Sequence, residues 1–386
     1  MHESPITRRR FVRAGGIAAA GAAAFACAPA ATGPAPGAAP SAAGANKPAW
    51  ERQWDELVTA AKKEGTLVLV TAVGATFKDG VAAFEKAFSG ITVEHTTINA
   101  SAFAPKALQE RKAGLYSYDA ITTTYGTLPL TMIPVGAMEP IRPLLFRPDV
   151  VEDKNWSDGF LAGFLDLDKK WGYSGFTEVT QSVWINTDLV KEGEIKTFDD
   201  LLNPKWKGKI IGGDPRTFGG GWWPATAMRI KRGDDGLIKR LFKDQGVVLS
   251  RDARQMIELL IKGNYSIGFL SSTQTIMPEF ISQGVGKNIK HIPIDEMDVQ
   301  NAGRSVAYVF NRAPHPNAAQ LFVNWLLTKE GSTIWSNVAQ TNSRRSDVAP
   351  ANPEVELKGR KLVHIDREEL LPEWQKTQDI AKQVLN

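Results

Sequence analysis

The sequence predicts an α/β fold that begins with an open parallel sheet. Three runs rich in β-forming residues lie at 66–72, 91–98 and 118–124, and their lengths suit buried strands. Amphipathic helical patterns separate them at 79–88 and at about 105–113. Strands that alternate with helices form parallel β-α-β units. We therefore expect the first part of the chain to build one open parallel sheet.

The loops that follow the first and third of these strands are the first candidate ligand sites. In an open parallel sheet, ligands bind beyond the carboxyl ends of the strands, and that rule selects residues 73–76 and 123–127. The candidate residues within them are Gly74, Thr76, Thr124 and Tyr125. The alternative is that each is an ordinary surface loop, since position alone does not separate the two interpretations.

Helical and extended patterns continue on both sides of this sheet. Residues 50–64 carry apolar side chains at helical spacing and end at Gly65, a residue that commonly ends helices. Residues 171–185 are rich in β-formers and are expected to be extended. Ser250 is expected to cap the helix that follows it. Further strands are expected at 210–211, 247–249 and 266–270, and further helices at 222–230, 236–244, 315–328 and 366–386.

A glycine-rich turn leads from a predicted strand into a predicted helix within residues 203–227 (NPKWKGKIIGGDPRTFGGGWWPATA). Backbone N–H groups at a helix N-terminus, together with the helix dipole, favour an anion. The alternative is a tight strand-to-helix turn with no ligand. Adjacent residues on a helix diverge by about 100°, so only one of Trp222 and Trp223 is expected to face a cleft. The candidate ligand-binding residues here are Arg216, Gly220, Gly221 and Trp222.

Residues 1–27 are predicted to be an export signal rather than part of the fold. Arg8 and Arg9 belong to a twin-arginine pattern, TRRRFVR, and the apolar stretch behind it is too short to span a bilayer. Cys27, the single cysteine, follows small residues and is the expected lipidation site, with ordinary cleavage nearby as the alternative. One cysteine cannot form an internal disulfide. Residues 28–48, rich in Ala, Pro and Gly, are predicted to be a flexible tether.

The export segment also accounts for most of the basic charge. The whole chain of 386 residues has a formal net charge of +4, and residues 1–26 hold four arginines and one glutamate. Without them the net charge is +1, which does not favour nucleic-acid binding. The remaining chain is long enough for two lobes with sizeable cores.

Four segments of the chain carry a family resemblance. They are NPKWKGKI with DPR in 203–216, INTDLVK at 185–191, APHPNAAQLFVNWLLTKEG at 313–331, and SRRSDV at 343–348. These motifs resemble bacterial extracellular solute-binding proteins, in the ferric-iron-type branch of ABC-importer receptors. The matches span about residues 65–350. The resemblance implies a type II periplasmic-binding-protein-like fold, in which two α/β lobes are hinged about a cleft that holds the ligand.

The same resemblance implies a domain organisation and a role. Lobe 1 is expected to comprise residues 49–177 plus 296–345, and lobe 2 residues 178–295 plus 346–386. The chain would first cross between the lobes near Glu178, which is therefore a candidate ligand-binding residue beside the hinge. The expected role is that of a monomeric, exported receptor. It would be tethered by lipid at the outer face of the cytoplasmic membrane or in the periplasm, and would deliver a small molecule to an ABC permease.

The expected ligand is a small organic anion rather than a bare ferric ion. Family members that bind free ferric ion generally use adjacent tyrosines, and the corresponding positions here are Ser271 and Ser272, followed by Thr273. These three are candidate ligand-binding residues, because hydroxyls suit an organic oxyanion. Arg216, Arg251 and Arg254 are considered as anion clamps, or alternatively as solvated surface arginines. A receptor for ferric ion or a ferric complex remains the main alternative.

Catalytic motifs are absent from the sequence. It contains no GxSxG, HExxH or Walker A motif, and the five histidines do not follow metal-ligand spacing. We therefore expect no enzymatic activity, no cofactor, no bound metal and no nucleic-acid partner. Two other classes stay open: a secreted enzyme on a related two-lobe fold, and a structural lipoprotein.

Overall fold

The protein is described by a computed structural model that covers residues 47–74, 76–217, 221–271 and 273–386, without the side chains of Gln274 and Thr275. The predicted export signal, Cys27 and most of the predicted tether lie outside the described residues, as do Gly220 and Ser272. None of the helices within the described ranges has both the length and the apolar character needed to span a membrane.

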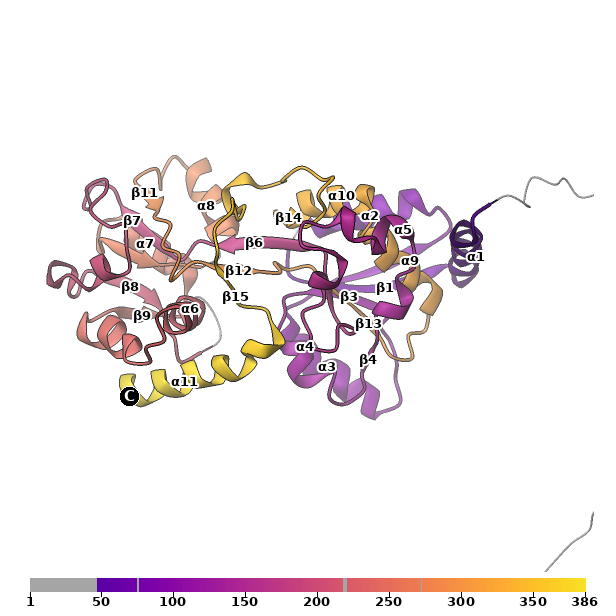
Figure 1. The fold of residues 1–386 in the computed structure, drawn as a ribbon, viewed down its shortest axis with the longest axis horizontal. Helices are drawn as coiled ribbons and strands as arrows, with labels where there is room; N and C mark the ends of the chain where they lie inside the picture. The colour runs from indigo at the N-terminus through magenta and orange to yellow at the C-terminus, as the bar shows by residue number, and fades with distance from the viewer. Residues whose placement is uncertain (1–46, 75, 218–220, 272) are drawn as a thin grey trace, which may run out of the picture. The chain divides into compact units, whose positions relative to one another are not determined.

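The first sheet takes strands from distant parts of the chain (Figure 1). β1 (Thr66–Thr71) lies between β2 (Thr92–Thr97) and β3 (Ala120–Thr123) and is parallel to both, as the alternation of strands and helices predicts. β13 (Val306–Phe310) then pairs antiparallel with β3. Two short strands pair antiparallel with β13, namely β4 (Met138–Glu139) and β5 (Tyr173–Ser174).

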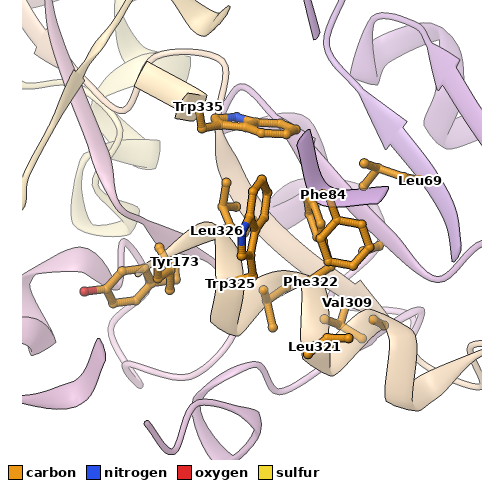
Figure 2. Close-up of a cluster of buried hydrophobic side chains, with 14 of the residues drawn as sticks. Leu69, Phe84, Tyr173, Val309, Leu321, Phe322, Trp325, Leu326 and Trp335 are labelled. Atoms are coloured by element: carbon orange, nitrogen blue, oxygen red, sulfur yellow. The ribbon is translucent and has the colours of Figure 1, made fainter. Parts of the chain in front are cut away.

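Helices cover both faces of this sheet because successive side chains of its strands point to opposite sides. Leu69 and Val309 belong to one buried cluster, whereas the neighbouring Val70 and Tyr308 belong to another. Figure 2 shows Leu69 and Val309 in the first cluster, beside aromatic rings of the covering helices. The first face packs against α1 (Ala49–Glu64), α2 (Phe77–Ala87), α9 (Pro316–Leu326) and α10 (Lys329–Ala339), and the second against α3 (Ala100–Lys112) and α4 (Thr127–Thr131).

The second sheet has the strand order β11-β7-β10-β8-β9. β8 (Ile210–Gly213) is parallel to β10 (Ile267–Phe269) and to β9 (Val248–Ser250), whereas β7 (Val183–Asn186) is antiparallel to β10 and to β11 (Ile289–His291). The helices beside this sheet are α6 (Trp222–Arg232), the π-helical η7 (Lys239–Asp244), α7 (Ala253–Ile261) and α8 (Thr273–Ser282).

A third, smaller sheet connects the two larger ones. β6 (Phe176–Thr180) is antiparallel to β12 (Val299–Asn301), and both lie between the two larger sheets in Figure 1. β14 (Asn342–Ser343) and β15 (Val363–His364) pair with β6 and β12. The C-terminal α11 (Leu371–Leu385) then packs on α6 and η7. The predicted lobe boundaries lie within or beside these connecting strands and stay a prediction.

Several predicted elements have different boundaries in the structure. α3 begins at Ala100 rather than near Pro105, because Phe103 and Ala104 are buried in the core ahead of the proline. The helix therefore carries Pro105 in its interior, at the cost of one backbone hydrogen bond. α7 is capped by the side chain of Asp252, which accepts from Gln255 N, rather than by Ser250. Ser250 Oγ instead accepts a hydrogen bond from Asp252 N.

The late helical region contains two helices, α9 and α10, where the sequence predicts a helix only at 315–328. α9 ends at Leu326, and Thr328 caps α10, since its Oγ1 accepts from Gly331 N. The short elements are α5 (Pro148–Val151) and the 3-10 turns η2 (Arg142–Leu144), η3 (Asp153–Asn155), η4 (Phe160–Gly163), η5 (Asp199–Leu202), η6 (Pro204–Trp206), η8 (Pro353–Val355) and η9 (Glu368–Leu370).

Candidate functional site

A cavity of roughly 200 Å³ lies where the first sheet, the connecting strands and α6 meet. Its volume is below the range of about 300–1,000 Å³ typical of pockets for drug-sized ligands, so it suits a small solute. We call it the hinge cavity, because β6 and β12 contribute to its wall. Its lining residues are Thr124, Tyr125, Glu178, Thr180, Trp223, Asn301, Gly303, Arg304, Gln340 and Asp366.

Thr124 and Tyr125 reach the hinge cavity because they directly follow β3 at the carboxyl edge of the parallel strands. Tyr125 is buried and packs edge-to-face against Trp374, with ring centroids 6.3 Å apart. Its phenolic oxygen has no hydrogen-bond partner among the described residues. Burial raises the pKa of Tyr125, and the nearby carboxyl of Glu368 raises it further. A buried hydroxyl without a partner is costly unless a water or a ligand satisfies it.

Two carboxyl groups face the hinge cavity. Glu178 lies on β6, opposite Asn301 of β12, and Asp366 follows β15. Burial raises the pKa of Glu178 to about 7, with Arg304 opposing this shift and Asp366 adding to it. Burial likewise raises the pKa of Asp366 to about 7, although its carboxylate accepts a hydrogen bond of 2.9 Å from Ala302 N.

Arg304 contributes a cationic side chain to the hinge cavity. Its Nη1 donates to the carbonyl oxygen of Val73 at 3.3 Å, and its Nη2 donates to that of Ala339 at 3.2 Å. These carbonyls come from the loop after β1 and from the end of α10. No ion pair joins Arg304 to a carboxylate within the described part of the chain. The guanidinium is therefore held in place without being neutralised.

Hydrogen bonds between the connecting strands and at the end of β12 fix the polar side chains of the cavity wall. Asn301 Nδ2 donates to Thr180 Oγ1 at 2.7 Å, and Gly303 N donates to Asn301 Oδ1 at 2.7 Å. Because the Thr180 hydroxyl accepts from Asn301, its own proton stays available to a ligand.

Other candidate residues from the sequence lie outside the wall of the hinge cavity. Arg216 donates through Nε and Nη2 to the two carboxylate oxygens of Asp214, at 2.9 and 3.1 Å. Arg251 pairs with the same carboxylate at 3.0 Å. Arg254 makes a two-pronged pair with Glu279 at 2.7 and 2.8 Å. All three arginines considered as clamps are therefore engaged by carboxylates of the protein itself.

The adjacent tryptophans face different surroundings. Trp222 is fully buried, and its indole N–H donates to the carbonyl oxygen of Trp374 at 3.2 Å. Trp223, one residue on, lines the hinge cavity. The expectation that only one of the two faces a cleft fits this arrangement, although the candidate named from the sequence was Trp222.

The remaining candidates lie near the hinge cavity or at the edge of the second sheet. Gly74 lies beside Arg304, since a Cβ added to it would be 3.9 Å from Nη1. Thr76 is exposed, and its hydroxyl donates to Val338 O. Gly221 directly precedes α6. It is packed so tightly that an added Cβ would lie 1.8 Å from Gly213 O. Ser271 follows β10, and Thr273 is a buried residue that begins α8.

Sequence reasoning missed seven residues of the cavity wall: Thr180, Trp223, Asn301, Gly303, Arg304, Gln340 and Asp366. The available signal was the predicted lobe boundaries at 177/178 and 295/296, because polar residues within or beside these two crossings were potential wall residues. Asp366 gave no such signal, since its segment reaches the cavity only through the pairing of β15 with β12. No group of three or more His, Cys, Asp or Glu side chains able to hold a metal ion occurs within the described ranges.

Comparisons with known proteins agree on the family and on the fold. The model of the bacterial extracellular solute-binding protein family matches residues 69–333. No curated protein matches the sequence. Iron-bound HitA from Pseudomonas aeruginosa is similar in structure with a TM-score of 0.59 and 17% identity, over 83% of this chain and 99% of HitA.

Two further solved structures share the fold. A putative extracellular solute-binding protein from Bordetella parapertussis has a TM-score of 0.64 at 13% identity, over 84% of this chain and all of its own. The spermidine/putrescine ABC transporter substrate-binding protein PotD from Streptococcus pneumoniae has a TM-score of 0.60 at 16% identity, over 83% of this chain and 98% of PotD. The fold is therefore the two-lobe periplasmic-binding-protein fold that the sequence predicts.

Proposed function

This chain belongs to the bacterial extracellular solute-binding protein family, and we propose that it captures a small organic ligand in the hinge cavity and delivers it to the permease of an ABC importer. The observation that carries this proposal is the composition of the cavity wall. It combines the edge of the first sheet, both connecting strands and α6, and it contains the buried, unpartnered hydroxyl of Tyr125.

A ligand in this position would favour closure of the lobes. Closure is driven by the difference between the affinities of the ligand for the closed and open forms. Glu178 and Asn301 lie on the connecting strands, whereas Tyr125 and Trp223 come from the elements on either side. A ligand that contacts all four residues makes its full set of contacts only when these elements are close together.

The ligand is proposed to carry an anionic group, such as a carboxylate, a phosphonate or a phosphate ester. Arg304 supports this proposal because only backbone carbonyls hold its guanidinium among the described residues. The hydroxyls of Thr124 and Thr180 add hydrogen-bond donors to the same wall. Charge-assisted hydrogen bonds from arginine to an oxyanion are among the stronger polar contacts in proteins.

A thermal-shift screen of small organic anions, with ferric citrate included, tests the proposal. A ligand at a hundredfold excess over its Kd stabilises the folded protein by about 2.7 kcal/mol. Arg304→Gln is expected to lower this stabilisation by about half or more, since a tenfold loss of affinity at the same ligand concentration removes about 1.3 kcal/mol. Arg254→Gln serves as a matched control on a surface arginine. Native mass spectrometry of protein from its source identifies any retained ligand. Absence of ligand-linked stabilisation would favour a structural lipoprotein, and turnover of a bound compound would favour an enzyme.

A ferric ion or ferric complex is the second candidate ligand. Its support is the pair of buried phenols, Tyr125 and Tyr308, neither of which has a hydrogen-bond partner among the described residues. The structurally similar HitA is iron-bound, and ferric ion prefers oxygen donors, by the matching of hard metals to hard ligands. A visible charge-transfer band on adding iron, lost in Tyr125→Phe, would establish this candidate instead of the organic anion.

Export and membrane attachment belong to the same proposal. The twin-arginine pattern at Arg8 and Arg9 supports export of the folded protein, and Cys27 supports a lipid anchor. Changing both arginines to lysine is expected to keep the protein in the cytoplasm. Cys27→Ser is expected to release the exported protein from membranes. A mature N-terminus beyond Cys27, identified by mass spectrometry, would end the claim of a lipid anchor.

A further inference from the structure

The hinge cavity holds charges of both signs that the protein does not pair with each other. Arg304 is bound by two carbonyl oxygens, whereas Glu178 and Asp366 form no ion pair among the described residues. All three side chains line the same cavity. A ligand with only one kind of charge would satisfy only one side of this arrangement.

Building on the proposed function, we propose that the ligand carries a basic amine as well as an anionic group, and that Glu178 and Asp366 bind the amine while Arg304 binds the anion. The ligand class is therefore a small aminocarboxylate, aminophosphonate or amino phosphate ester. The juxtaposition of two carboxyls and one arginine in the wall of a single small cavity carries this inference.

The carboxyl groups are suited to an ammonium group. Burying a carboxylate away from water is unfavourable unless a cation or hydrogen-bond donors compensate it. Asp366 is 6% exposed and has one backbone donor, Ala302 N. No hydrogen bond to the carboxylate of Glu178 occurs within the described part of the chain. An ammonium group has three N–H donors, enough to reach both carboxylates and one further acceptor.

Other residues of the wall fit the same assignment. The phenolic oxygen of Tyr125 lacks a partner and is able to accept the third hydrogen bond of an ammonium. The indole of Trp223 lines the cavity too, and tryptophan rings attract cations through their electron-rich faces. Both features favour a ligand with a positively charged end.

Ligands of a single charge are disfavoured by the same wall. A simple anion would lie close to two carboxyl groups, which must then be protonated to avoid like-charge repulsion. A polyamine would place one of its cationic ends toward the guanidinium group of Arg304, which repels it. A ligand with one charge of each sign avoids both penalties.

The ionisation of the carboxyls supplies a pH signature. Both have a pKa of about 7, so both are partly protonated near neutral pH. The charged groups that act on them are Arg304 and Asp366 for Glu178, and Arg367 for Asp366. An ammonium favours the ionised carboxylates, so its binding releases protons and strengthens as pH rises from 6 to 8. A simple anion favours the protonated forms, so its binding weakens over the same range.

Calorimetric titration of the full mature protein with matched probes tests this inference. The pairs are 3-aminopropanoate with propanoate, and 2-aminoethylphosphonate with ethylphosphonate, and putrescine represents cations without an acid group. In at least one pair, the amino compound is expected to bind roughly tenfold tighter or more than the matched anion. This factor corresponds to the free energy of a hydrogen bond to a charged group. Its advantage over the matched anion is expected to grow between pH 6 and pH 8.

Variants connect this result to the two carboxyls. Glu178→Gln and Asp366→Asn are expected to remove the advantage of the amino compound, while Glu279→Gln, a surface carboxyl paired with Arg254, is expected to keep it. Thermal unfolding establishes that each variant is folded. If amino compounds bind tightest but both carboxyl variants keep the preference, the assignment of these residues is wrong.

The outcomes separate this inference from the proposed function. Equal or tighter binding of the anions without an amine overturns the inference and leaves the receptor function intact. Tightest binding of putrescine, or a retained native ligand without a basic nitrogen, overturns it as well. If no compound in these pairs or in the wider screen binds, the receptor function itself fails, and the inference fails with it.

Discussion

Two charged regions of similar composition differ in how their charges are paired. At the end of β8, the carboxylate of Asp214 binds Arg216 and Arg251. In the hinge cavity, Glu178 and Asp366 share a wall with Arg304, yet no ion pair joins these residues to one another or to other described residues. The first region is complete within the protein, whereas the second leaves its charged groups available to a ligand.

The pKa values show the same contrast. Burial acts to raise the pKa of Asp214, but hydrogen bonds from Arg216 and Arg251 outweigh it and leave the value below its usual range. Glu178 and Asp366 lack such compensation, and their pKa values rise to about 7. Pairing with arginines offsets the cost of burying the carboxylate of Asp214. The unpaired carboxyls of Glu178 and Asp366 lower the stability of the ligand-free protein, and a bound ligand can recover this loss.

The largest expected effect concerns the backbone beside Asp214, in the region where the charges are paired. Gly221→Ala places a Cβ 1.8 Å from the carbonyl oxygen of Gly213, a backbone atom that cannot rotate away. We expect a loss of about 3 kcal/mol or more in unfolding free energy, at the upper end of overpacking effects. Urea unfolding measures it. Gly236→Ala, whose added Cβ would meet only movable side chains, is the control, and an equal loss there would contradict the prediction.

Asp214→Asn is expected to have the next largest effect. It removes a carboxylate that is 6% exposed and accepts bonds from two arginines, so we expect a loss of about 1–3 kcal/mol at pH 7. The pKa of Asp214 in the folded protein is below its unfolded value near 3.8. Its contribution is therefore present above pH 4 and lost as pH falls below that. Thermal unfolding at pH 7 and pH 3 measures this, and a difference that is undiminished at pH 3 would count against the ion pairs.

The unpaired carboxyls are expected to show the opposite sign. Asp366 has a folded pKa of about 7 against an unfolded value near 3.8, so the folded state binds more protons and loses stability as pH rises from 4 to 7. Asp366→Asn removes this penalty and is expected to stabilise the ligand-free protein at pH 8 by about 1–3 kcal/mol. Near pH 4 it is expected to have little effect. Destabilisation at pH 8 would show that the carboxylate has a partner in the protein.

The smallest expected effect concerns ligand affinity. Arg216→Gln changes an arginine that is already paired with Asp214, so we expect ligand affinity to change by less than about twofold, a shift of under 0.5 kcal/mol. Arg304→Gln is expected to lower affinity roughly tenfold or more, since it removes a charged donor from the cavity. Calorimetric titration compares the two variants. Similar losses in both would end the distinction between the two regions.

Part of the candidate site follows from patterns that are local in the sequence. The carboxyl-end rule for parallel strands selected the loop after β3, and the structure brings Thr124 and Tyr125 of that loop to the hinge cavity. Glu178 was selected because it lies at a crossing between lobes, and it lines the same cavity. The first argument needs only the order and direction of strands, which hydrophobic periodicity reveals. The second rests on the family resemblance, which is carried by motifs contiguous in the chain.

Other parts of the site were beyond sequence reasoning. Arg216 and Arg304 have the same side chain and both lie near strands, but Arg216 pairs with a carboxylate, whereas Arg304 is held by carbonyl oxygens. Asp366 reaches the cavity through a short strand that pairs with β12. Trp222 and Trp223 are distinguished only by which side of α6 packs on α11.

The sequence by itself determined the α/β class, the order of the main strands, the family and the loop that supplies Tyr125. These depend on runs and periods of a few residues, and on motifs that are contiguous in the chain. Only the tertiary structure decided which charges are paired and which face the cavity. Arg304 is held by carbonyls of residues 73 and 339, far from it in the sequence, and burial among such distant segments sets the ionisation of Glu178 and Asp366. Desolvation and ion pairing act through space, so residue type and neighbours in sequence do not determine them.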